Sequence, residues 1–118
     1  MERLSELPGS ERERVLSLPN LRAAAEQVYN LGLAKQFTNT ATFTIEGVYL
    51  RGSPLPPVFV LRSSSGKEYR FDPVSTEYPP YIANMVNQNE NLIGRKITLN
   101  ISYGKPWYPS LFITSISD

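Results

Sequence analysis

The sequence predicts a small α+β domain, mainly β, in which a five-stranded antiparallel barrel follows a helical extension. Three observations support this class. Residues 97–103 alternate apolar and polar side chains, which is the two-residue period of a half-buried strand. Residues 111–116 have similar β character on the far side of a Pro-rich loop. The first third of the chain instead repeats apolar residues at helical spacing.

The composition argues against some classes of function but does not identify one. The 118 residues suffice for one domain with its own core. The 12 Lys and Arg nearly balance the 11 Asp and Glu, which argues mildly against tight binding to duplex nucleic acid. No apolar run approaches the roughly 20 residues of a membrane span. We therefore expect a soluble intracellular protein, located in the cytoplasm, without a membrane partner.

The chain contains neither Cys nor His. Disulfides, thiol nucleophiles, imidazole bases and metal sites built from these residues are therefore excluded. The carboxylates show no spacing typical of a metal pair. The stretch from Ser64 to Lys67 is not a phosphate-binding loop, because it lacks the first glycine and Lys67 lies in a predicted strand. We expect no catalytic residue, no metal and no cofactor.

Residues 1–35 are expected to form the helical extension and residues 36–118 the barrel domain. A first helix fits from about Glu11 to Leu18 and ends at Pro19. Asn20 is a suitable cap for a second helix. The apolar face of this second helix consists of Leu21, Ala25, Val28 and Leu31. We expect the face to pack on the barrel or on a second copy of the chain. The alternative is that it binds a different partner.

The first strand is expected within residues 38–50, with Phe43, Ile45 and Tyr49 on one face and Gly47 at a bulge or bend. Residues 51–57 contain three prolines and cannot be regular structure. Residues 58–62 and 67–71 read as a hairpin around a Ser-rich turn.

A short helix is expected over residues 80–90, because proline is tolerated in a first helical turn. The last two strands follow it. The residues expected in the core are Phe43, Ile45, Val60, Ile97, Leu99, Ile101 and Ile113.

The resulting order β-β-β-α-β-β resembles that of the OB-fold, a small and partly open barrel. The resemblance covers about residues 38–117 and lies in element order alone, without a sequence motif. It implies that loops, together with the face of the second and third strands, would carry a ligand such as an oligonucleotide.

Aromatic and basic residues interleave through the β region. Single-stranded nucleic acid is held by aromatic rings under bases and by cations along phosphates, so a few exposed aromatics suffice without a large net charge. The principal hypothesis is therefore a module that binds single-stranded DNA or RNA. The residues expected to form the site are Trp107, Tyr108, Lys105, Arg95, Lys96, Arg62, Tyr69 and Arg70.

Proline and aromatic residues also occur together at residues 53–57, 78–81 and 105–109. Rigid loops that carry Tyr and Trp are typical of protein interfaces as well. The alternative hypothesis is therefore a protein-interaction or assembly subunit that uses these loops and the N-terminal amphipathic helix, including self-association through that helix.

Overall fold

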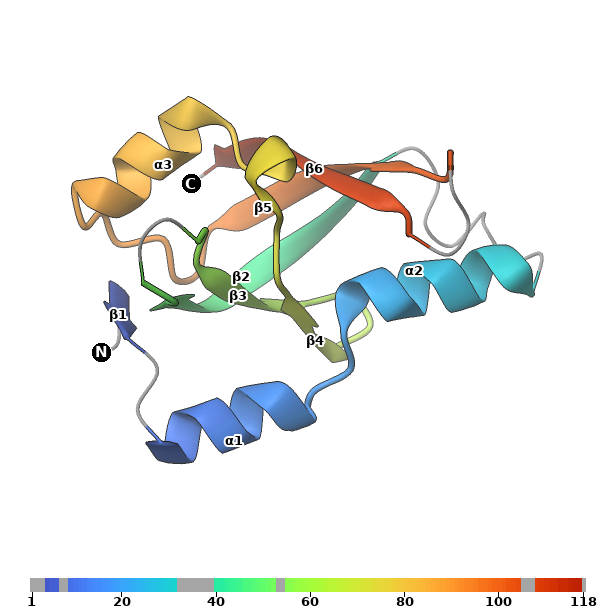
Figure 1. Cartoon of the computed structure of the whole chain (residues 1–118), viewed down its shortest axis with the longest axis horizontal. Coiled ribbons are helices and arrows are strands. Elements are labelled where there is room, and N and C mark those ends of the chain that lie inside the picture. The colour runs from blue at the N-terminus through green and yellow to red at the C-terminus, as the bar shows by residue number, and fades with distance from the viewer. Residues whose placement is uncertain (1–3, 7–8, 32–39, 53–54, 105–107, 118) are drawn as a thin grey trace.

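The computed structural model of the chain describes residues 4–6, 9–31, 40–52, 55–104 and 108–117 (Figure 1). The helices and strands alternate along the chain much as the sequence predicts. In chain order they are β1 (Leu4–Glu6), α1 (Gly9–Ser17), α2 (Leu21–Asn30), β2 (Thr40–Leu50), β3 (Val58–Arg62), β4 (Glu68–Phe71), the 3-10 helix η2 (Ser75–Glu77), α3 (Pro80–Asn87), β5 (Lys96–Ser102) and β6 (Ser110–Ser117).

One sheet contains all the described strands, and its antiparallel part has the order β4-β3-β2-β5-β6. The predicted α+β class with a five-stranded antiparallel sheet is confirmed. The short strand β1 was not predicted. It pairs in parallel with residues Val48 to Leu50 of β2, beyond the point where the β2–β5 ladder ends. The N-terminal segment thus contributes a strand to the sheet as well as helices.

The predicted OB-like barrel, expected to be closed or half-closed, is not closed in the structure. Among the described residues no ladder joins β4 to β6, the two ends of the antiparallel order. The outer edge of β4 is instead occupied by the turn between α1 and α2. The backbone N–H of Arg70 donates to the carbonyl of Pro19 at 2.8 Å, and Asn20 forms an isolated parallel bridge with Arg70. Because that edge is already paired, β6 cannot complete the ring there.

Gly47 lies at a bulge, as the sequence predicts. The register between β2 and β3 shifts between Ile45 and Gly47. A Cβ atom at Gly47 would lie 2.7 Å from Cε2 of the Tyr49 ring, so only glycine fits beneath that ring. The bulge also reverses which side chains face inward. Tyr49 therefore does not share a face with Phe43 and Ile45, which corrects the predicted pattern.

The core has two parts. The main cluster lies inside the curved sheet and receives Leu21 and Ala25 from α2, together with Ile82 and Val86 from α3. All of the residues predicted in the core are buried. A smaller cluster lies between α1 and β3, on the other face of the sheet. Its buried members are Val15, Tyr49, Val58 and Val60.

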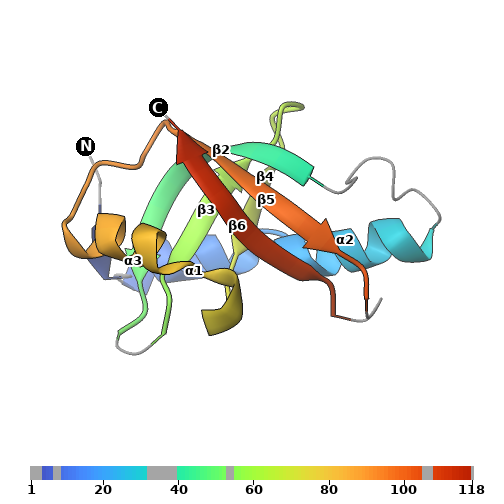
Figure 2. The ribbon, with the colours of Figure 1, turned by 90° about the horizontal axis from the view of Figure 1, so that it is seen from above.

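The helices cover both faces of the sheet. α2 and α3 pack on the main cluster inside the curve, whereas α1 packs on the other face through Val15. Figures 1 and 2 show α2 and α3 toward opposite ends of the long axis of the molecule. Only part of the predicted apolar face of α2 is covered, since Val28 is half-buried and Leu31 is 63% exposed. No helix in the described ranges combines the length and apolar character needed to cross a membrane.

Candidate functional site

A buried ion pair spans the gap between β4 and β6. Glu77, which is 2% exposed, follows β4, and Arg22 lies in the first turn of α2. Arg22 donates from Nη1 to Glu77 Oε2 at 2.8 Å and from Nη2 to Oε1 at 2.5 Å. The same carboxylate accepts from the backbone N–H of Leu111 in β6 at 2.7 Å and from that of Val74 at 3.1 Å. Arg22 also donates to the carbonyl of Pro109.

These side-chain contacts link the segment after β4 to β6, a link that backbone hydrogen bonds would have provided in a β4–β6 ladder. Burial on its own would raise the pKa of Glu77, because desolvation disfavours a carboxylate. The hydrogen bonds from Arg22, Leu111 and Val74, together with the Arg22 charge, outweigh that effect and lower the pKa below its ordinary value of 4.5. Burial opposes the charge of Arg22 too, and pairing with Glu77 raises its pKa overall. Both groups are therefore charged at neutral pH.

We expect acid to destabilise the protein through Glu77. A carboxylate with a lowered folded-state pKa binds its proton more readily in the unfolded chain. Its stabilising contribution is complete above the ordinary pKa of 4.5 and is lost as the pH falls from there through the folded-state value. Urea titrations between neutral pH and the acid range measure this. In Glu77→Gln the free energy of unfolding should fall less steeply below that pH than in the wild-type protein. An equal pH dependence in both proteins would contradict the lowered pKa of Glu77.

Two loops meet beside this ion pair and border an open hollow of about 550 Å³. The β2–β3 loop reaches it with Arg51, Leu55 and Pro56, and the β5–β6 loop reaches it with Tyr108. The remaining lining residues come from the start of α2 and from the segment after β4. They are Asn20, Arg22, Asp72, Pro73, Val74 and Ser75. We call this feature the inter-loop hollow.

Arg51 supplies the hollow with a fixed positive charge. Its Nε donates to the carbonyl of Pro56 at 2.6 Å and its Nη2 to that of Pro73 at 2.9 Å. Within the described part of the chain it forms no ion pair with a carboxylate. The other charged lining residues are paired, Arg22 with Glu77 and Asp72 with Arg70 at 3.3 Å. A half-buried guanidinium that is held by carbonyls retains N–H donors for an anion.

Tyr108 supplies an aromatic surface at the same place. Its side chain is 48% exposed. The guanidinium carbon of Arg22 lies 4.5 Å from the ring centroid, so a cation covers one face of the ring. Because Glu77 holds Arg22 in place, the ring is supported from that side. The exposed part of the ring is available to a flat partner.

The expected site residues that the structure describes, six of the eight, do not lie on one surface. Trp107 and Lys105 lie outside the described residues. Arg95 and Lys96 lie at the start of β5, whereas Tyr108 follows the end of that strand. A strand of 7 residues spans about 20 Å, so these cations and the Tyr108 ring lie at opposite ends of the β5–β6 pair. Arg95 is also paired with Glu90 at 3.7 Å.

Three expected residues are engaged elsewhere. Tyr69 is only 8% exposed and meets Phe43 edge-on in the core, so its ring is not presented to a base. Arg70 donates to the carbonyl of Leu16 and pairs with Asp72. Arg62 is exposed at the end of β3 and donates to Glu46 at 2.6 Å. Their roles in the fold explain these positions without reference to a ligand.

The nucleic-acid site predicted from the sequence did not include Arg22, Arg51 or Leu55. A local signal existed for Arg51, which directly follows a long strand and precedes a rigid Pro-rich loop. No local pattern marks Arg22, because its partners are 55 and 87 residues away in the chain.

Comparison of the chain with protein-family models, with curated proteins and with solved structures found no match. Within the described ranges, no three acidic side chains gather closely enough to hold a metal ion.

Proposed function

We propose that this chain is a non-catalytic binding module, built on an incompletely closed OB-like barrel, that binds single-stranded nucleic acid at the inter-loop hollow. One observation carries the proposal: the exposed Tyr108 ring and the Arg51 guanidinium line the same hollow, which two loops border. Among the described residues this guanidinium has no carboxylate partner.

The strand order supports the fold part of the proposal. Counted from β2, the sheet has the pairings of a five-stranded Greek-key barrel that is open between its third and fifth strands. In OB-folds the loops after the first and fourth strands flank the ligand. The corresponding loops of this chain are the β2–β3 and β5–β6 loops, and both border the hollow. The outer face of β3 is covered by α1, since Val58 and Val60 are buried with Val15. The loops are therefore the accessible part.

The chemistry of the hollow suits a single strand better than a duplex. A base can stack on the exposed part of Tyr108, while the adjacent phosphate accepts hydrogen bonds from Arg51. The lining adds one unpaired positive charge rather than a basic stripe, which agrees with the nearly balanced charge of the chain. Trp107 and Lys105, next to Tyr108 in the sequence, are expected to add stacking and charge.

We expect the single tryptophan to report binding. Mixed-sequence single-stranded DNA and RNA should quench Trp107 fluorescence at low salt, and affinity should fall with salt because cations are released from the strand. Tyr108→Ala should weaken binding by about 1–3 kcal/mol, the usual stacking contribution. Tyr108→Phe keeps the ring and should bind almost normally. Arg51→Gln should reduce the salt slope by about 0.7, as expected for one phosphate contact on a single strand.

Arg62→Gln is the matched control, because this arginine is paired with Glu46 away from the hollow. It should leave both affinity and salt slope unchanged. Absence of quenching and of a mobility shift at tens of micromolar would contradict the proposal. So would equal affinity of the wild-type protein and Tyr108→Ala.

The alternative, a protein-interaction or assembly subunit, has one specific observation in its favour. Leu31 at the end of α2 is 63% exposed, and Leu16 on α1 is 56% exposed. If these residues mediate self-association, Leu31→Glu should change the mass measured in sedimentation experiments and leave oligonucleotide binding intact.

A further inference from the structure

The first four residues of β2 extend past the end of the ladder with β3. That ladder begins at the pair of Thr44 and Arg62. After Arg62 the chain turns away, and the N–H of Ser63 closes the β3–β4 hairpin by donating to the carbonyl of Lys67 at 2.9 Å. On the β3 side, no described strand lies beside residues 40–43.

The backbone of Thr42 faces this open side. In an antiparallel pair, successive residues alternate between bonding to the partner strand and pointing away from it. Ile45 bonds toward β5, since its N–H donates to Arg95 and its carbonyl accepts from Gly94. Residues 43 and 41 therefore also bond toward β5, and Thr42 points the other way. The 3.2 Å contact between the hydroxyls of Thr42 and Thr98 fits a close pair that shares no backbone hydrogen bond.

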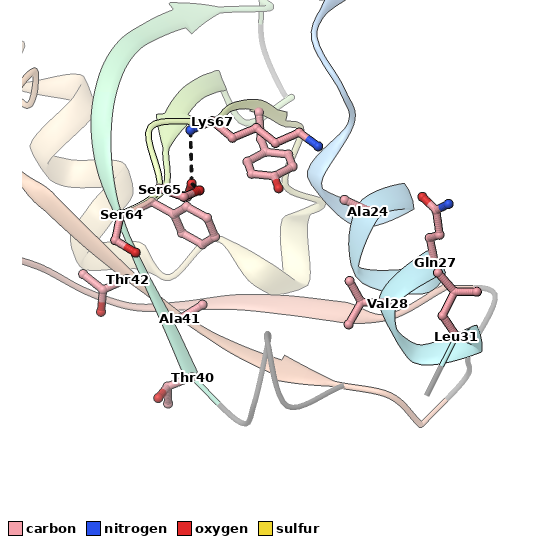
Figure 3. A pocket seen from close by; sticks show the side chains of 13 residues that line it. Ala24, Gln27, Val28, Leu31, Thr40, Ala41, Thr42, Ser64, Ser65 and Lys67 are labelled. Carbon is pink, nitrogen blue, oxygen red and sulfur yellow. Dashed lines mark hydrogen bonds between the residues drawn. The ribbon is translucent and has the colours of Figure 1, made fainter. Parts of the chain in front are cut away.

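A groove of about 480 Å³ runs along this edge (Figure 3). One wall is α2, from which Ala24, Val28 and Leu31 present apolar side chains. The end of the groove is the hydroxyl-rich β3–β4 turn with Ser64 and Ser65. In Figure 3 the Lys67 side chain reaches from this turn toward α2. The groove thus has on one side the Thr42 backbone, which has no partner strand on the β3 side among the described residues, and on the other an apolar helix face.

We propose that this edge groove binds an extended acidic peptide segment of another protein, which adds to the sheet as a strand beside β2. The proposal is independent of nucleic-acid binding, since the two sites share no lining residue. Strand addition satisfies the Thr42 N–H and carbonyl through main-chain hydrogen bonds, and alternate peptide side chains provide specificity.

The lining of the groove determines the chemistry of the peptide. Side chains that point inward would meet Ala24 and Val28 and must be apolar. Those that point outward would lie beside the hydroxyls of Thr42 and Ser64 and can be polar. Lys67 is the only charged residue in the described lining, which contains no carboxylate. An acidic side chain near the turn is therefore favoured over a basic one.

Selection from a displayed library of random peptides tests this directly. The enriched sequences should alternate apolar and polar residues and contain an acidic residue. Thr42→Pro removes the edge N–H without removing a hydrogen bond to β5, because that N–H points away from β5. Binding of a synthetic enriched peptide should weaken at least about tenfold in this variant. Thr42→Val keeps the N–H, loses only the hydroxyl, and should bind like the wild-type protein.

Lys67→Glu provides a second test that does not depend on proline at a strand position. It should reverse the charge preference, so that the acidic peptide binds more weakly and a basic analogue more strongly. The proposal is overturned if no peptide is enriched, or if Thr42→Pro binds normally while keeping the wild-type melting temperature. It is also overturned if Thr42→Pro converts a dimer to a monomer, which would make a second copy the occupant. Weakened oligonucleotide binding in Lys67→Glu, without any peptide binding to the wild-type protein, would assign the groove to nucleic acid instead.

Discussion

Replacing Glu77 with alanine is expected to lower the free energy of unfolding by about 3–5 kcal/mol. The carboxylate accepts hydrogen bonds from Arg22, from Leu111 in β6 and from Val74, and it is almost fully buried. Its removal leaves a largely buried guanidinium without a counter-charge and two backbone N–H groups without an acceptor. Breaking one partner of such a pair costs much more than the pair itself contributes. Urea unfolding at neutral pH measures the change.

A double-mutant cycle with Arg22→Ala separates the ion pair from the backbone contacts. The loss in free energy of unfolding in the double variant should be clearly smaller than the sum of the losses in the two single variants. The reason is that the second substitution removes the charge that the first leaves unpaired. The residual cost then reports on the Leu111 and Val74 amides. A loss below about 1 kcal/mol for Glu77→Ala, the range typical of an exposed pair, would show that the gap between β4 and β6 does not depend on this contact.

Replacing Leu99 with alanine is expected to cost about 2–5 kcal/mol through lost burial and the cavity left behind. Leu99 is fully buried in the main cluster, on strand β5, which pairs with β2 on one side and with β6 on the other. Asn100→Ala, one residue along the strand on the exposed face, is the matched control and should stay within about 0.5 kcal/mol. The contrast between neighbours measures the alternation of the strand directly. Similar losses of stability at both positions would contradict the assignment of Leu99 to the buried face and of Asn100 to the exposed face.

Local patterns in the sequence were sufficient to identify the separate elements. Period-two alternation at residues 97–103 identifies a strand and its inward face, because burial alternates along any strand with one covered side. The same reasoning placed every predicted core residue correctly. Asn20 was recognised as a helix cap from its residue type, and its Oδ1 accepts from the N–H of Arg22 at 2.9 Å. Such contacts lie within a few residues, where the chain itself sets the geometry.

The candidate site was accessible to sequence reasoning only in part. Tyr108 was expected on a loop, and it lies there with an exposed ring. Tyr69 was expected in the same site as Tyr108. It is instead a core residue, because its ring packs in the main cluster inside the sheet. The Arg51 side chain is held at the hollow by hydrogen bonds to the carbonyls of Pro56 and Pro73. Which cation remains unpaired depends on where every carboxylate lies, and composition does not contain that information.

The sequence by itself determined the order of the α-helices and strands from α1 to β6, the inward faces of most strands and the glycine bulge, because each depends on neighbours along the chain. Tertiary structure alone decided how the sheet ends. β4 does not pair with β6 in the described residues, and at its outer edge the N–H of Arg70 instead donates to the carbonyl of Pro19. The remaining gap is spanned by Glu77, which bonds residues 55 positions before it and 34 positions after it. No periodicity encodes such contacts, since the partners meet only after the chain has folded around the core.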